Sequence, residues 1–185
     1  MKKIILTITE GSNIELLKIA ENCYRKKFLN LKILNKSLPI NDVPFRINFK
    51  GLKQYLADAI LEKGYNLIEE NSILIIITDF DIYTHGTNYI FGLATKDIGL
   101  ISSARIDPKF WEMFPEIHYY SKMGKDFFIR QYEKVLLHEL GHTISLPHCN
   151  NIECVMRYSN SPIELYSKGE DYCKKCWEYL KNHFL

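Results

Sequence analysis

Three histidines in the C-terminal third of the chain are spaced so that they could bind one metal ion. His138 and His142 lie four residues apart in the string HELGH, a spacing that places both imidazoles on one face of a helix. His148 follows after Pro147. A helix that continued through this segment would carry His148 about 9 Å past His142 along its axis, so we expect the helix to end and the chain to turn back. The spacing therefore predicts a zinc site made of three imidazoles.

Glu139 is the candidate catalytic residue of this site. It follows the first histidine directly, so its carboxylate would lie beside the metal without binding it and could accept a proton from zinc-bound water. Three neutral histidines leave the fourth position of a tetrahedral zinc open, which is the arrangement of a catalytic ion. The ion would polarise a scissile carbonyl, and Glu139 would act first as a base and then as an acid toward the leaving amine. The remaining histidines have no such neighbours and are interpreted as ordinary surface or core residues: His85, His118 and His183.

Four of the five cysteines predict a second metal site. They form two pairs, the second of which is a CxxC, and together they would surround a zinc ion with thiolates: Cys149, Cys154, Cys173 and Cys176. A site of this kind has no open position, so it would hold the last part of the chain together and do no chemistry. A redox-active CxxC is the alternative. It is disfavoured because Lys174 and Lys175 do not open a helix after a thioredoxin-like strand, and because two further cysteines would be left unexplained.

The composition is that of a folded domain with little charge bias. The chain has 185 residues, of which 46% are hydrophobic and 25% are charged, and this apolar content excludes intrinsic disorder as its general state. The formal net charge of +2 favours neither a nucleic acid nor an anionic membrane as a partner. The longest apolar run, Ile73 to Ile77, is too short to span a bilayer. The N-terminal string MKKIILTITEG is interpreted as a β-strand rather than a signal peptide, which favours a cytoplasmic location with reduced cysteines.

Short β-rich runs alternate with helical patterns, which is typical of a layered α/β domain. The apolar periodicity predicts helices over residues 12–29, 52–69 and 126–142. The first helix would begin with a capping box of Ser12 and Glu15 and would bury Cys23. Strands are predicted over residues 3–9, 31–36, 73–80, 89–95 and 98–105, and loops over residues 37–50 and 106–125.

The strand over residues 73–80 is predicted to lie centrally in the sheet. Its unbroken aliphatic run suits a strand that is covered on both faces. The last two strands are joined so tightly around Lys96 and Asp97 that a hairpin is expected, and the sheet would then be mixed, with one antiparallel member. Because no repeat or linker divides the chain, we expect residues 1–185 to form one domain.

The string HELGHTISLPHCNNIECVM, with CKKC downstream, resembles the archaemetzincin (archaelysin) family of the metzincin clan. That family's pattern is H-E-x-x-H-x-x-G-x-x-H-C-x4-C-x-M followed by C-x-x-C, and the resemblance covers residues 138–176. It implies a zinc metallopeptidase with an α/β (α+β-like) fold. This fold would have a mixed five-stranded sheet with one antiparallel edge strand, an active-site helix and a small zinc-stapled C-terminal subdomain. The two parts would cover residues 1–145 and 146–185.

The resemblance also implies roles for individual residues. The three histidines would hold a catalytic zinc, the four cysteines would hold a second, structural zinc, and Glu139 would be the base. Met156 would pack beneath the catalytic zinc. An extended peptide substrate would pair with the edge strand around Tyr89 to Thr95, and aminopeptidase activity on short peptides is associated with family members. We assume a monomer whose partner is a peptide or protein substrate, with neither a nucleic acid nor a membrane bound.

One departure from the family pattern motivates an alternative function. Ser145 stands where the family has a glycine, and a non-glycine residue there costs about 1 kcal/mol if it must adopt a positive φ. The alternative is a zinc-stabilised peptide-binding protein with weak or no proteolytic activity. Tyr158 is either a residue that assists the oxyanion, as in some metzincins, or a plain surface tyrosine. A nucleic-acid-binding module is disfavoured by the balanced charge, and we interpret the local cluster of lysines as a solvated face: Lys168, Lys174, Lys175 and Lys181.

Overall fold

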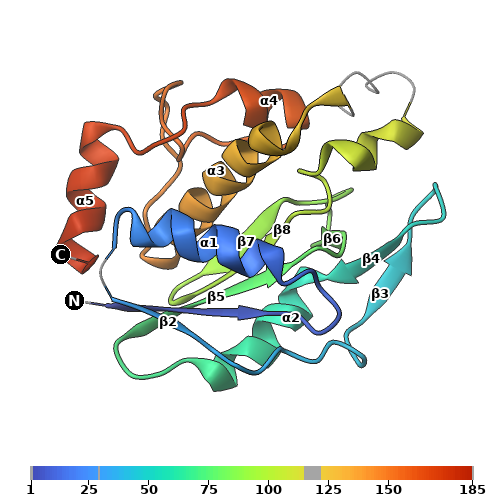
Figure 1. Ribbon diagram of the computed structural model, residues 1–185, viewed down its shortest axis with the longest axis horizontal. Helices are drawn as coiled ribbons and strands as arrows, with labels where there is room; N and C mark the ends of the chain where they lie inside the picture. Colours follow the sequence, from blue (N-terminus) through green and yellow to red (C-terminus); the bar gives the residue numbers. More distant parts are fainter. Residues whose placement is uncertain (1, 29, 115–121, 185) are drawn as a thin grey trace.

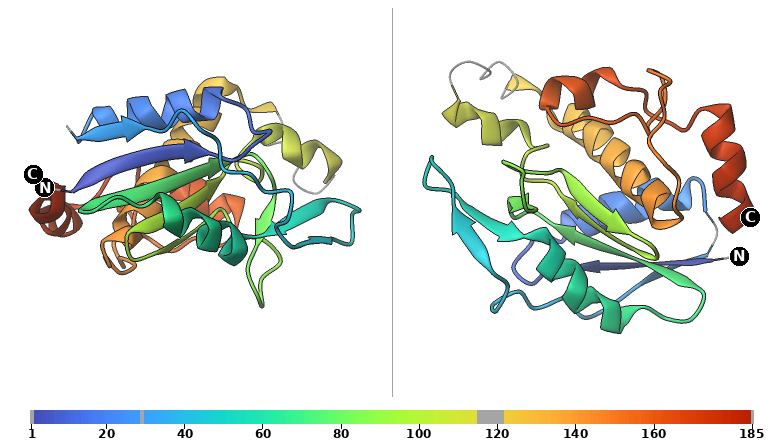
Figure 2. Two further views of the ribbon diagram at one scale, coloured as in Figure 1. Left: turned by 90° about the horizontal axis from the view of Figure 1, so that it is seen from below. Right: turned by 180° about the vertical axis from the view of Figure 1, so that it is seen from behind.

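The computed structural model describes residues 2–28, 30–114 and 122–184 and arranges them in three layers (Figure 1). A five-stranded sheet lies between α1 and α3 on one face and α2 on the other (Figure 2). The chain after α3 adds α4 and α5 beside the first of these helical layers. In chain order the helices are α1 (Glu15–Arg25), α2 (Ala57–Gly64), α3 (Lys125–Thr143), α4 (Pro162–Ser167) and α5 (Lys174–Phe184).

The sheet is mixed, as predicted. In spatial order its strands are β2 (Leu31–Ile33), β1 (Lys3–Ile8), β5 (Ser72–Thr78), β8 (Ile98–Ser102) and β7 (Gly92–Thr95). All neighbouring pairs are parallel except β7 and β8, which form the predicted antiparallel hairpin. Strand β7 therefore lies at the edge of the sheet, and β5 lies in the centre, with each of its residues buried.

The central strand packs into two hydrophobic cores. Ile73, Ile75 and Ile77 contribute to the core beneath α1 and α3, whereas Leu74 and Ile76 contribute to the core beneath α2. Because side chains alternate across a strand and both faces are covered, this position in the sheet requires an unbroken aliphatic run. Helix α3 also packs against β7 and β8, so its position relative to the edge of the sheet is fixed.

The helix predicted over residues 52–69 is partly wrong. The segment begins with a strand, β4 (Lys53–Leu56), continues as α2 and ends with a 3-10 helix, η1 (Tyr65–Leu67). Apolar residues at the start of the segment satisfy the spacing of a helix, but pairing of β4 with two neighbouring strands decides its conformation.

A second, three-stranded sheet was not predicted. Strand β3 (Phe45–Ile47) lies within the predicted loop over residues 37–50 and pairs antiparallel with β4. Strand β6 (Ile82–Tyr83) pairs parallel with β4 on its other side. Strands of two and three residues are too short to produce a recognisable alternation in a sequence.

The predicted capping box at the start of α1 is wrong. The helix begins at Glu15, whose amide donates to Oδ1 of Asn13 at 3.0 Å. The hydroxyl of Ser12 lies 2.8 Å from that of Thr9 and accepts a hydrogen bond from the amide of Asp79. It therefore contacts the residues that follow β1 and β5 instead of capping α1. Cys23 is buried in α1, as predicted.

The remaining differences concern element boundaries. Strand β2 is shorter than its prediction, and β7 and β8 cover only part of the predicted ranges. The predicted loop over residues 106–125 contains a 3-10 helix, η2 (Pro108–Met113), and its residues 115–121, with His118, lie outside the described residues. In the part of the chain that the structure describes, no helix is both long and apolar enough to cross a membrane.

Candidate active site and metal sites

The three histidines converge on one point. His138 and His142 project from the same face of α3, and the chain turns back after the helix to bring His148 to them. The Nε2 atom of His142 lies 3.1 Å from Nε2 of His138 and 3.1 Å from Nε2 of His148. Zinc–nitrogen bonds of 2.0–2.1 Å in a tetrahedral site require nitrogens about 3.3 Å apart. The three side chains are therefore able to hold a metal ion.

The turn that returns the chain depends on Ser145. This residue adopts φ of 64°, a left-handed conformation that favours glycine. Its amide donates to the carbonyl of His142 at 2.9 Å, and the amide of Leu146 donates to the carbonyl of Gly141 at 3.0 Å, so the last turn of α3 is closed. Ser145 therefore adopts the positive φ that was considered for the position of the family's glycine. The three histidines converge even though this residue is a serine.

Replacing Ser145 by glycine is expected to stabilise the protein. Ser145→Gly relieves the left-handed strain of the folded state. Glycine also makes the unfolded chain more flexible, which offsets part of this effect, so the net gain in the free energy of unfolding is up to about 1 kcal/mol. Thermal unfolding should shift upward by about 1–4 °C. Ser145→Ala is the matched control, because alanine keeps the strain and should give no increase. An equal shift for both variants would show that the serine side chain, not the backbone, sets the stability here.

Backbone carbonyls orient the two helical histidines. Nδ1 of His138 lies 2.8 Å from the carbonyl oxygen of Val155, and Nδ1 of His142 lies 2.9 Å from that of Leu146. These contacts leave both Nε2 atoms free for a metal. Burial lowers the pKa of His138 well below its usual range and that of His142 to about 4, so both rings are neutral near pH 7 and competent as ligands.

Glu139 is buried between α3 and the edge strand. A Cβ atom on Gly92 of β7 would lie 2.6 Å from Cγ and 2.7 Å from Oε1 of Glu139, so the strand can approach the carboxylate only because residue 92 is a glycine. Burial raises the pKa of Glu139 to about 8, and the charge of Lys168 acts in the opposite direction. A carboxyl group with this pKa can both accept and release a proton near neutrality.

Met156 is buried against the active-site helix. A Cβ atom on Gly141 would lie 2.4 Å from Sδ of Met156, so glycine at this position lets the methionine pack directly on the turn of α3 between the two histidines. The carbonyl of Met156 also accepts a hydrogen bond from the amide of Cys149 at 3.0 Å. Met156 is thus packed between the segments that present the histidines and the cysteines.

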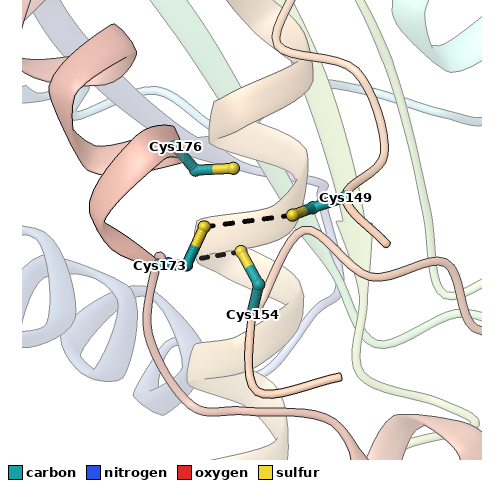
Figure 3. Close-up of side chains that lie close together, drawn as sticks. All are labelled: Cys149, Cys154, Cys173 and Cys176. Carbon is teal, nitrogen blue, oxygen red and sulfur yellow. Dashed lines mark hydrogen bonds between the residues drawn. The ribbon is translucent and has the colours of Figure 1, made fainter. Parts of the chain in front are cut away.

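The four cysteines of the predicted second site also come together (Figure 3). All are free thiols, and their sulfur atoms lie within 4.8 Å of one another. Sγ of Cys149 is 3.9 Å from Sγ of Cys173. Zinc–sulfur bonds of about 2.3 Å in a tetrahedral site place sulfurs about 3.8 Å apart. This group is therefore also able to hold a metal ion.

One argument made against a redox-active CxxC is only partly right. Helix α5 begins at Lys174, immediately after Cys173, so the CxxC does open a helix, but the element that precedes it in the described chain is helix α4 rather than a strand. The amide of Cys176 lowers the pKa of Cys173 to about 7, which favours the thiolate form. The second argument still holds, because Cys149 and Cys154 lie in the same cluster and a two-cysteine redox motif would not use them.

The chain is similar to known proteins. A sequence model of peptidase family M54 matches residues 45–182. The chain belongs to this family. An archaemetzincin from Pyrococcus furiosus is 34% identical over 165 residues, which cover 87% of this chain and 81% of the relative. An archaemetzincin from Methanocaldococcus jannaschii is 35% identical over 161 residues, which cover 85% and 83%.

The fold is similar to that of a solved archaemetzincin. The crystal structure of the protein from Methanopyrus kandleri aligns with a TM-score of 0.77 and 26% identity, covering 98% of this chain and 94% of that chain. The predicted family, fold and enzyme class are therefore confirmed: the chain is a zinc metallopeptidase of the archaemetzincin family.

The three histidines and Glu139 line a cleft of about 640 Å³. The edge strand β7 and the segment that precedes it form one wall, and the chain around Tyr158 forms another. The ring of Tyr158 is exposed and packs edge-on against the ring of His148, with centroids 5.0 Å apart. Both interpretations of Tyr158, as an assisting residue or as a plain surface residue, agree with this position.

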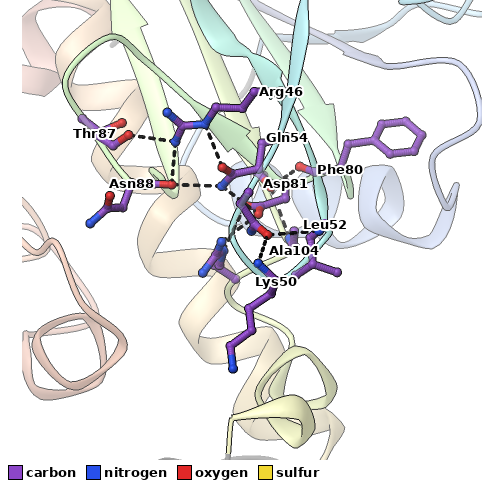
Figure 4. Close-up of polar contacts among 12 residues, drawn as sticks. Arg46, Lys50, Leu52, Gln54, Phe80, Asp81, Thr87, Asn88 and Ala104 are labelled. Carbon is purple, nitrogen blue, oxygen red and sulfur yellow. Dashed lines mark hydrogen bonds and ion pairs between the residues drawn. The ribbon is translucent and has the colours of Figure 1, made fainter.

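A polar network that includes the cleft-lining residue Asn88 was not predicted (Figure 4). Asp81 is buried and accepts hydrogen bonds from Arg105 at 3.0 and 2.8 Å and from Gln54 at 2.9 Å. Gln54 donates in turn to the carbonyl of Asn88, and Arg46 donates to the same carbonyl. The network fixes the segment that leads into β7 and lines the cleft. Its members are far apart in the sequence, so no local motif could have revealed it.

The interpretation of Lys168 as part of a solvated face is wrong. Lys174 and Lys175 are exposed, but the side chain of Lys168 is buried and lines the cleft beside His138 and Glu139. Burial lowers the pKa of Lys168 to about 8, and the charge of Glu139 opposes this shift. A lysine at this spacing gives no signal in the sequence, because its burial depends on how the segment after Met156 folds over α3.

Proposed function

We propose that this chain hydrolyses peptide bonds with Glu139 as its general base and with His138, His142 and His148 as the ligands of a catalytic zinc. The observation that supports this role is the convergence of three Nε2 atoms beside a buried carboxylate in an open cleft. Zinc, when bound, would polarise the scissile carbonyl and acidify water. Glu139 would take the proton of the attacking water and pass it to the leaving amine.

We propose that the substrate is an extended peptide that pairs with the free edge of β7. Among the described residues, strand β7 pairs with β8 alone, and its residues Gly92, Leu93 and Ala94 line the cleft. Backbone hydrogen bonds along such an edge bind peptides with little dependence on their side chains. Action on short peptides as an aminopeptidase remains a prediction of the family resemblance.

The four cysteines are proposed to hold a second, structural zinc, which gives two ions per chain. Their spacing around one point supports this site, and four thiolates leave no position for water or substrate. The second site would fix residues 146–185 as a subdomain of a single domain that begins with residues 1–145. Nothing in the geometry favours a non-catalytic peptide-binding protein, because Ser145 does not separate the three histidines.

Digestion of a peptide library by the zinc-loaded protein, with Glu139→Ala as the inactive reference, tests the proposed hydrolysis. Cleavage by the wild type that disappears in the variant supports the function. A wild-type protein that binds zinc and peptides without cutting them would support the peptide-binding alternative.

Gly92→Ala is expected to lower activity by about 10- to 100-fold with little effect on folding. The added Cβ would lie within 2.7 Å of the Glu139 carboxylate, so either the carboxylate or the edge strand must move. Misplacing a catalytic group by about 1 Å can lower the rate by about 100-fold. The measurement is kcat/KM on one peptide, together with thermal unfolding. Gly124→Ala, where the added Cβ meets no atom within 4 Å, is the control and should retain most of the activity. Unchanged kcat/KM in Gly92→Ala would show that the approach of β7 does not position Glu139.

A further inference from the structure

Lys168 is a buried lysine among the residues that line the cleft. Only 4% of the residue is exposed, and it lines the same cavity as His138 and Glu139. Buried ammonium groups are normally paired with a carboxylate or surrounded by hydrogen-bond acceptors, because an unpaired buried charge costs several kcal/mol. The groups that accept hydrogen bonds from the Lys168 ammonium therefore indicate whether its charge is already satisfied within the protein.

The neighbouring Lys134 shows the usual solution. It is buried too, and its ammonium donates to the carbonyls of Leu165 at 3.3 Å, Tyr166 at 3.1 Å and Lys168 at 2.9 Å. These three acceptors lie at the C-terminal end of α4, so Lys134 caps that helix with all three of its donors. Its charge needs no further partner.

Lys168 lacks such a set of acceptors. Its Nζ lies 3.3 Å from the carbonyl oxygen of Arg157 and 3.3 Å from Nδ1 of His138. If Nε2 of His138 binds zinc, as the proposed function requires, the proton of the neutral ring is on Nδ1 and is donated to the carbonyl of Val155. Nδ1 then cannot accept from Lys168, and within the described part of the chain the ammonium keeps one acceptor, the carbonyl of Arg157, for its three donors.

No carboxylate compensates for this deficit through direct contact. Among the described residues, Lys168 forms no ion pair within 4.0 Å, although Glu139 favours its charge through space. The lining of the same cavity includes the buried apolar residues Val135 and Leu165. The site thus combines apolar walls with an under-coordinated cation, which suits a carboxylate on a short aliphatic stem.

We propose that Lys168 binds a carboxylate of the peptide substrate and so makes this cleft selective for acidic groups. The carboxylate could belong to an aspartate or glutamate side chain or to the C-terminus of a short peptide, because all present the same oxygens to the ammonium. Lys168 is then a specificity residue that acts on substrate binding, next to the catalytic groups but with a different task.

The test compares matched peptides that differ in one charge. In a series of N-acetylated, C-amidated peptides, each glutamine is replaced in turn by glutamate, and a second pair differs only in a free or amidated C-terminus. We expect one acidic position to raise kcat/KM by about 10- to 100-fold, mainly through KM, as for a hydrogen bond to a charged group. The first series detects a side-chain carboxylate and the second detects a terminal one.

Three lysine variants separate the role of Lys168 from general electrostatics. Lys168→Met should abolish the preference for the acidic peptide while the neutral peptide is still cut. Lys174→Met and Lys175→Met, each of which removes an exposed lysine, should keep the preference. The absence of any acidic preference in the wild type, or an equal fall for both peptides in Lys168→Met, would overturn the proposal.

Binding measurements keep the proposal testable if the proposed peptidase activity fails. Fluorescence anisotropy with the same peptide sequences, in which a dye replaces the N-acetyl group, gives Kd for wild type and Lys168→Met without any turnover. A preference of about tenfold or more for the acidic peptide that is lost in Lys168→Met supports the carboxylate site even in a protein that cuts nothing. Equal Kd values for acidic and neutral peptides would reject it, whether or not hydrolysis occurs.

Discussion

Glu139→Ala is expected to abolish peptide hydrolysis while the fold and the metal content stay unchanged. Removal of a general base lowers rates by about 10²–10⁴-fold, and here the same group is proposed to deliver the proton to the leaving amine as well. The side chain is not one of the predicted ligands, so zinc should still bind to His138, His142 and His148. In the described part of the chain Glu139 forms no hydrogen bond or ion pair, so its loss breaks no direct contact, although it removes a negative charge that favours the charged form of Lys168.

The measurement combines peptide-library digestion, zinc stoichiometry and thermal unfolding. Glu139→Gln preserves the shape of the side chain and should be as inactive as the alanine variant, because an amide cannot accept the proton. Glu133→Ala is the matched control in the same helix: Glu133 pairs with Lys26 at 2.8 Å, away from the cleft, and its loss should leave kcat unchanged. Turnover at the wild-type rate by a fully zinc-loaded Glu139→Ala protein would contradict the proposed role of this carboxylate.

The residues of the candidate site could be predicted because their spacing is local and their chemistry is restrictive. Histidines four residues apart on a helix must share a face, and few functions other than metal binding use three of them together. The central strand was predictable for a related reason, since an unbroken aliphatic run such as Ile73 to Ile77 fits only a fully covered position.

The features that sequence reasoning missed depend on contacts between distant segments. Gly92 matters only because β7 lies against Glu139, and nothing near Gly92 in the sequence indicates that approach. Lys168 had the same local appearance as Lys174, yet one is buried in the cleft and the other is exposed. Strand β4 was mistaken for helix because its apolar spacing fits both states, and pairing with β3 and β6 decides between them.

Cys173→Ser is expected to remove one equivalent of zinc and to destabilise the protein strongly. Structural zinc contributes about 10 kcal/mol or more to the folding of small zinc-bound peptides, so losing even a third of such a contribution would lower the melting temperature by about 10 °C. Metal analysis should fall from two ions per chain to one. Cys23→Ala is the control, because Cys23 is buried in α1 outside the cluster and its replacement should leave both ions in place.

Loss of the cysteine site should also weaken catalysis, because the two sites share their supports. Cys149 follows His148 directly, and the hydroxyl of Tyr172, next to Cys173, donates to the carbonyl of Leu137, next to His138, at 2.5 Å. We therefore expect kcat/KM of Cys173→Ser to fall together with its stability, even at temperatures where the protein remains folded. Loss of the second ion with unchanged melting temperature and unchanged kcat/KM would contradict a structural role. If wild-type protein as purified contained a Cys173–Cys176 disulfide and only one zinc, the redox interpretation would replace the four-thiolate site.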